Sequence, residues 1–102
     1  MIIMDTKDFQ RMCNKVIEDI DNKIGLERDH QLHFTQLMEE IGELAKDINM
    51  PRLRSKSADV NNLSGEFADV FLLLFSLAEK HGIDVEDSTL SKMEKLKERH
   101  GI

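Results

Sequence analysis

Residues 67–78 read FADVFLLLFSLA, and this stretch decides what kind of fold the chain can adopt. Every residue in it except Asp69 and Ser76 is apolar. A helix of this composition is apolar around most of its circumference, so it must be covered on more than one side. We therefore predict a helix over about residues 62–81 that ends at Gly82 and packs against several neighbours.

Hydrophobic periodicity on either side of this stretch predicts three further helices. Asp5 is expected to cap the start of the first helix and Gly25 its end, and Pro51 stops the second. Residues 50–61 lack periodicity and are expected to form a basic loop. The four predicted helices lie at about residues 6–24, 29–49, 62–81 and 84–101.

The length of 102 residues predicts one domain, residues 1–102, and composition and periodicity predict that it is all-α, built as a four-helix bundle. Three other short helices can hardly cover the apolar stretch, so a second copy of the chain is expected to complete the bundle. We expect a homodimer or a dimer of dimers.

Composition narrows the possible partners and the compartment. The net charge of -6 argues against nucleic acid as a partner, because phosphate backbones bind basic surfaces. No stretch is long and apolar enough to predict a membrane span. The single cysteine, Cys13, lies in an apolar helical stripe, which predicts a buried, reduced thiol and a cytoplasmic protein.

Two acidic motifs carry the candidate chemistry: Glu39, Glu40 and Glu43 in the second helix, and Glu66 and Asp69 in the third. Residues three apart on a helix project within roughly 60° of each other, so each motif places carboxylates on one face. The first motif lies away from its helix's apolar stripe, and a solvated acidic face is the commoner outcome for such a group. The second motif needs a partner, because an unpaired carboxylate in an apolar helix is costly.

A divalent cation is one candidate partner, because no Lys or Arg precedes Lys80 in the third helix. Carboxylate oxygens alone suit Mg²⁺ or Mn²⁺ rather than zinc. The four histidines show no ligand spacing and are expected to be surface or capping residues: His30, His33, His81 and His100.

The spacing Glu-Glu-x-x-Glu, 22 residues, Glu-x-x-Asp resembles the signature of the MazG-like all-α nucleoside triphosphate pyrophosphohydrolases. The similarity extends from about Phe34 to Arg99. It implies cleavage between the α and β phosphates of a nucleoside triphosphate, in a house-cleaning role. It also implies four Mg²⁺ ligands, Glu40, Glu43, Glu66 and Asp69, with Glu39 as a further ligand or as the group that orients the attacking water.

The resemblance further implies that basic residues of the last helix meet the phosphates. These residues are Lys92, Lys95 and Arg99. Many relatives have Asn where this chain has Leu96, so one polar contact to substrate is expected to be missing. Three cations of the basic loop either close over the polyphosphate or remain solvent-exposed: Arg52, Arg54 and Lys56.

Two other functions stay open at this point. Phosphoribosyl-ATP pyrophosphatase has a similar small helical fold, but its relatives usually carry a Tyr-His pair where this chain reads Phe71-Leu72-Leu73-Leu74. A non-enzymatic helical interaction module, with merely solvated acids, is the alternative from another class of protein.

Overall fold

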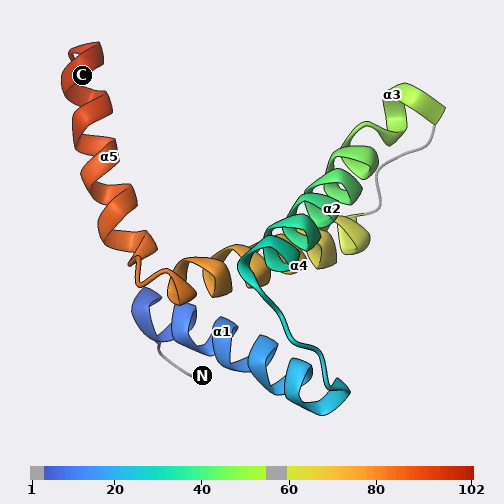
Figure 1. The fold of residues 1–102 in the computed structure, drawn as a ribbon. Helices are drawn as coiled ribbons and strands as arrows, with labels where there is room; N and C mark the ends of the chain where they lie inside the picture. The colour runs from blue at the N-terminus through green and yellow to red at the C-terminus, as the bar shows by residue number, and fades with distance from the viewer. Residues whose placement is uncertain (1–3, 55–59) are drawn as a thin grey trace.

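The computed structural model describes residues 4–54 and 60–102, and this part of the chain contains helices but no strands (Figure 1). The all-α prediction is therefore confirmed. The helices are α1 (Thr6–Ile24), α2 (His30–Ile48), α3 (Met50–Arg54), α4 (Val60–Lys80) and α5 (Val85–His100).

Local capping explains why α1, α2 and α5 begin and end near where the sequence predicts. Asp5 accepts a hydrogen bond from the Asp8 backbone N–H at 2.8 Å, and Asp29 and Asp84 cap α2 and α5 in the same way. Gly25, with φ of 72°, ends α1 in the left-handed region, which glycine enters without a steric penalty.

The predicted loop at residues 50–61 is partly wrong. Residues 50–54 form α3, and α4 begins at Val60 rather than near Asn62. Pro51 lies in the first turn of α3, where its missing N–H costs no hydrogen bond, so it begins a helix as well as ending one. Arg52 is exposed, while the Arg54 side chain and Lys56 lie outside the described residues.

The apolar helix α4 is the central element, because α1 and α2 each pack along it. Ile17 of α1, Leu37 of α2 and Leu73 of α4 form the buried cluster. Cys13 is buried, as predicted. Much of the predicted apolar stripe of α1 nevertheless faces solvent in the single chain. Its exposed members are Phe9, Met12, Val16, Ile20 and Ile24.

Helix α5 does not lie alongside the other helices of its own chain. It contacts α1 only at a small surface and projects away from α2 and α3, as Figure 1 shows. No residue of α5 is buried. The radius of gyration is 16.5 Å, whereas a compact chain of this length has about 13 Å. One chain therefore does not by itself form the predicted four-helix bundle.

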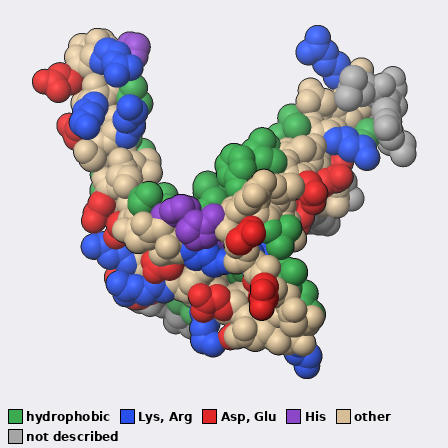
Figure 2. All heavy atoms as spheres, viewed as in Figure 1, with side chains coloured by type: hydrophobic (Ala, Val, Ile, Leu, Met, Phe, Trp, Pro, Cys, Tyr) green, Lys and Arg blue, Asp and Glu red, His purple; other side chains and the backbone are tan. Residues whose placement is uncertain are grey.

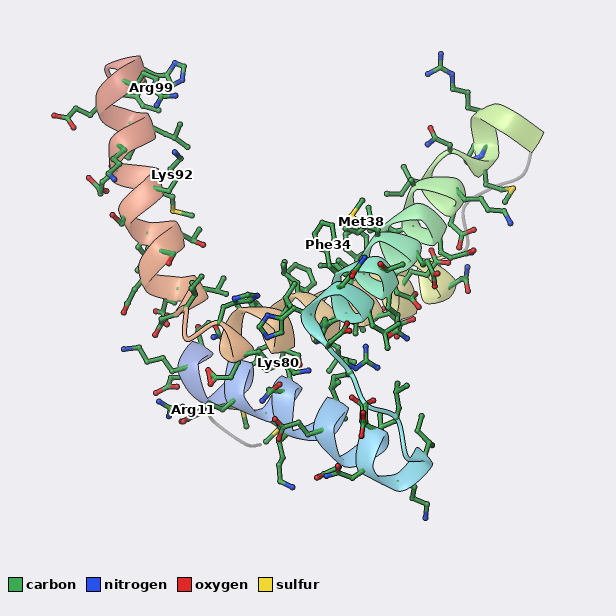
Figure 3. The ribbon with its side chains drawn as sticks, viewed as in Figure 1. Arg11, Phe34, Met38, Lys80, Lys92 and Arg99 are labelled. Atoms are coloured by element: carbon green, nitrogen blue, oxygen red, sulfur yellow. The ribbon has the colours of Figure 1, made fainter. Side chains whose placement is uncertain are left out.

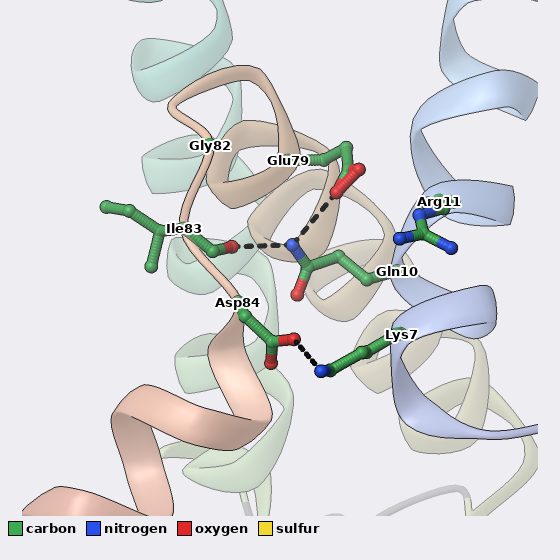
Figure 4. Close-up of a pocket in the computed structure, with 7 residues that line it drawn as sticks. All are labelled: Lys7, Gln10, Arg11, Glu79, Gly82, Ile83 and Asp84. Atoms are coloured by element: carbon green, nitrogen blue, oxygen red, sulfur yellow. Dashed lines mark hydrogen bonds and ion pairs between the residues drawn. The ribbon is translucent and has the colours of Figure 1, made fainter.

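Gln10 holds the corner between α4 and α5 (Figure 4). This side chain is 3% exposed. Its Nε2 donates to the Ile83 carbonyl at 2.6 Å, and its Oε1 accepts from the Val85 N–H at 3.0 Å. Lys7 adds an ion pair to Asp84 at 3.4 Å. A cavity of about 220 Å³ lies at this corner. We infer that these polar groups set the direction of α5.

In the described part of the chain, no helix has the length and hydropathy that crossing a membrane would require.

Candidate functional site

A cavity of about 240 Å³, which we call the central cavity, lies where α1, α2 and α4 meet. It brings together one acid from each predicted motif, Glu40 from α2 and Asp69 from α4. Arg28 and Gln36 supply its other polar groups. The remaining lining residues are apolar: Ile17, Ile20, Leu72 and Leu73.

The pKa of Glu40 reveals how the acids influence one another. Burial raises this pKa above its ordinary value, and the negative charges of Asp69, Glu43 and Glu39 raise it further. The carboxylate is half-buried, so Glu40 does not belong to a fully solvated acidic face. Glu39, Glu43 and Asp69 are exposed. Both motifs therefore contribute to one region of negative potential.

Glu66 is the most perturbed acid of this region. Its hydrogen bond to Asp47, its burial, and the charges of Asp47, Glu43 and Glu40 raise its pKa to about 7. Its Oε2 is buried and has no hydrogen-bond partner among the residues that the structure describes. A buried acceptor without a donor, beside other acids, is a place where a cation fits, because a cation supplies the missing positive charge.

Asp47 is the member of this region that the sequence interpretation missed. It pairs with Glu66 and also accepts a hydrogen bond from Asn62. A signal was present, since Asp47 lies seven residues after Glu40 and four after Glu43. Seven residues are nearly two helical turns, so the acidic face of α2 extends one turn beyond the motif.

These acids influence one another without forming a ready-made metal centre. In residues 4–54 and 60–102, no three His, Cys, Asp or Glu side chains are grouped closely enough to hold a metal ion. The ligand assignment from the sequence therefore stays a prediction.

The predicted phosphate-binding cations are not brought to this site within one chain. Figure 3 shows Lys92 and Arg99 on α5, well away from the acidic part of α2 and α4. Lys95 lies on the same helix, and all three residues are exposed. The cation that does line the central cavity is Arg28, which precedes α2.

Arg28 forms a buried ion pair with Asp21, and the two side chains are 6% and 8% exposed. The guanidinium donates from Nε to Asp21 Oδ2 at 2.8 Å and from Nη2 to Oδ1 at 3.1 Å. This fork holds the pKa of Asp21 below its ordinary value. Arg28 also donates from Nη1 to the Gln36 Oε1. One arginine thus joins α1 to α2 at the edge of the central cavity.

The prediction that all four histidines are surface or capping residues is wrong for His33. This residue is fully buried, and its Nε2 donates to the Leu73 carbonyl at 2.7 Å. Nδ1 is then the acceptor for Lys80, whose Nζ is 3.4 Å away. Burial lowers the pKa of His33, which favours the neutral ring. The side of α2 that carries His33 faces α4, a rotation that periodicity alone did not reveal.

We expect the stability of the metal-free protein to depend on pH through Glu66. Between its ordinary pKa of 4.5 and about 7, the folded chain retains a proton that the unfolded chain has released. The free energy of unfolding should therefore fall as the pH rises through this window. Glu66→Gln removes this contribution, so the variant should gain stability relative to the unmodified protein between pH 5 and pH 8.

Urea titrations at both pH values, with a chelator present, measure this difference. His33 acts in the opposite direction, because its lowered pKa makes the folded state lose stability as the pH falls. That effect is common to both proteins and cancels in the comparison. An equal stability difference at the two pH values would contradict the assignment.

Comparison with known proteins gives one result. The family model described as MazG nucleotide pyrophosphohydrolase domain matches residues 28–101. The match begins at Arg28 and includes α2 and α4, which carry both acidic motifs, as well as α5. No curated protein and no solved structure matches the chain significantly.

Proposed function

The chain belongs to the MazG nucleotide pyrophosphohydrolase family, and on that premise we propose that it hydrolyses nucleoside triphosphates to nucleoside monophosphates and pyrophosphate. The observation that carries the proposal is the acidic region beside the central cavity, where Glu66 has a buried, unpartnered oxygen and a pKa of about 7. A cation-dependent site for a polyanionic substrate has this electrostatic character. The proposed role is house-cleaning of unwanted nucleotides in the cytoplasm.

We propose Mg²⁺, with Mn²⁺ as a substitute, as the cofactor. Its ligands would come from both motifs: Glu40, Glu43, Glu66 and Asp69. Such a cation, when bound, would neutralise phosphate charge and lower the pKa of a water molecule. Glu39, exposed at the edge of the region, would orient the attacking water through its carboxylate.

Lys92, Lys95 and Arg99 would bind phosphate oxygens of the substrate. Because α5 projects away from the acidic region of its own chain, we propose that these cations reach the phosphates within an assembly, a homodimer or a dimer of dimers. The accessible surface supports this assembly. It is 7843 Å², about a third more than the roughly 5,900 Å² expected for a folded monomer of this mass.

Apolar side chains supply a surface for such an assembly. On α4, Phe67, Phe71 and Leu74 are 45%, 46% and 40% exposed. Figure 2 shows further hydrophobic side chains along α2, on the side that faces α5 in this view, and Figure 3 places Phe34 and Met38 there. Soluble monomers rarely expose large contiguous apolar patches, so side chains of this kind favour an interface.

Phe71→Asp should therefore dissociate the assembly while leaving the chain folded. The Phe71 ring is nearly half exposed in one chain, so a charge there faces water in the monomer but would be buried in an apolar interface. Sedimentation velocity at micromolar concentration measures the effect. Ile83→Asp is the matched control, because this side chain is 50% exposed but lies at the turn between α4 and α5. Identical sedimentation of the Phe71→Asp variant and the unmodified protein would refute this interface.

Released pyrophosphate, measured separately from orthophosphate, tests the activity itself. A panel of ribo- and deoxynucleoside triphosphates with Mg²⁺ should yield pyrophosphate and the monophosphate, and a chelator should stop the reaction. Orthophosphate with a diphosphate product would contradict the proposed position of cleavage. If Mg²⁺ and Mn²⁺ neither support turnover nor raise the melting temperature, the chain is instead an interaction module.

A further inference from the structure

Gln36 is held in one orientation at the wall of the central cavity. Its side-chain oxygen accepts a hydrogen bond from Arg28 Nη1, and within the described residues its Nε2 has no partner. A guanidinium can only donate, so it can bind only the oxygen of the amide. The amide cannot flip without losing this bond and leaving Arg28 unsatisfied.

Arg28 is itself fixed. Two hydrogen bonds tie it to Asp21, and both side chains are buried. A chain of contacts from α1 through Arg28 to α2 therefore determines which end of the Gln36 amide remains available. That end is the NH₂ group, a hydrogen-bond donor.

The surroundings of this donor indicate the kind of group that it would meet. Half of the residues that line the cavity are aliphatic, and Glu40 lies one helical turn from Gln36. A volume of about 240 Å³ is smaller than the roughly 300–1,000 Å³ of a pocket that encloses a whole drug-sized ligand. It suits one flat part of a substrate that has apolar faces and a polar edge.

We infer that Gln36 is a specificity-determining residue: its fixed NH₂ group donates to a carbonyl oxygen on the edge of the substrate's nucleobase. This inference rests on the proposed function and deepens it. The base would lie against the apolar lining, and the phosphates toward the acids. Uracil, thymine and guanine carry a carbonyl where cytosine and adenine carry an amino group, so a fixed donor favours the former.

Deoxyuridine and deoxycytidine triphosphates test this directly, because they differ chiefly in the carbonyl or amino group at C4. We expect the unmodified protein to have the higher kcat/KM for dUTP. Gln36→Glu replaces the donor with an acceptor and should shift the dUTP/dCTP ratio toward dCTP by about tenfold or more. Methionine neither donates nor accepts a hydrogen bond here, so Gln36→Met should bring the dUTP/dCTP ratio of kcat/KM close to one.

Gln31→Glu is the matched control, since Gln31 is exposed on the same helix and does not line the cavity. It should leave the ratio unchanged. An unaltered dUTP/dCTP ratio in Gln36→Glu, or an equal change in Gln31→Glu, would overturn the inference.

A binding measurement without turnover separates this inference from the proposed function. With divalent cations chelated, millimolar dUMP should shift the NMR signal of the Gln36 side-chain NH₂, and deoxyribose 5-phosphate should not. Equal shifts with both compounds, or none with dUMP, would overturn the base contact. A shift with dUMP in a protein that releases no pyrophosphate from any triphosphate would refute the hydrolase and leave the base site standing.

Discussion

Glu66→Gln should reduce metal-dependent pyrophosphate release by about a hundredfold or more while the protein remains folded. The amide keeps the shape of the carboxyl group but removes the charge that a cation needs. It also ends the proton sharing with Asp47 that accompanies the pKa of about 7. If Glu66 is the charged ligand that we propose, its loss removes interactions made in the transition state, so kcat should fall with little change in fold.

The measurement is steady-state pyrophosphate release with saturating Mg²⁺, together with circular dichroism of the variant. Asp69→Asn should behave similarly, since Asp69 lines the central cavity with Glu40. Asp8→Asn is the control. This carboxylate is exposed and pairs with Arg11 of its own helix at 3.5 Å. Full turnover in both the Glu66 and Asp69 variants would refute the site.

Arg28→Leu should lower the free energy of unfolding by about 3 kcal/mol or more. The substitution removes the guanidinium that, within the described residues, pairs with Asp21, and it leaves a carboxylate that is 8% exposed without this partner. Breaking a buried pair costs more than breaking an exposed one, because the remaining charge has lost both water and its counterion. Urea denaturation measures the loss.

Arg11→Leu is the matched control, because Arg11 pairs with Asp8 on the surface. The Arg11 side chain is 67% exposed and the Asp8 side chain 57%. This variant should lose less than about 1 kcal/mol of the free energy of unfolding. Removing both charges, as Asp21→Leu with Arg28→Leu, should recover much of the stability lost in the single variant. Similar costs for the Arg28 and Arg11 variants would show that burial of the Asp21 pair contributes nothing.

The same pair has a pH dependence of known sign. Arg28 holds the pKa of Asp21 below its ordinary 3.8, so the stabilisation is present above that value. It is lost as the pH falls through the lowered pKa. The difference in the free energy of unfolding between the unmodified protein and the Arg28→Leu variant should therefore shrink in strong acid.

Helix positions and the family were predictable from sequence because their signals are local. Asp5 and Gly25 cap α1 through bonds to residues a few positions away, and such contacts do not depend on the rest of the fold. The acidic spacing from Glu39 to Asp69 likewise lies within two helices, and the family match over residues 28–101 agrees with it.

Charge environment was not predictable, because it depends on how each helix is rotated against its neighbours. Asp47 follows an acidic motif by one turn, yet only the approach of α4 makes it the partner of Glu66. His33 was expected to be a surface or capping residue because the four histidines show no ligand spacing, yet α2 turns it against the Leu73 carbonyl. The direction of α5 depends on Gln10, which lies 75 residues before Val85.

The amino-acid sequence by itself determined an all-helical chain with two acidic motifs and the family to which it belongs. Periodicity, caps and residue spacing are short-range properties that any later packing must preserve. Tertiary structure alone decided that Glu40 and Asp69 share a cavity with Arg28 and Gln36, and that α5 projects away from them. Those outcomes depend on burial and on contacts between residues far apart in the chain, which change with small rotations of one helix against another.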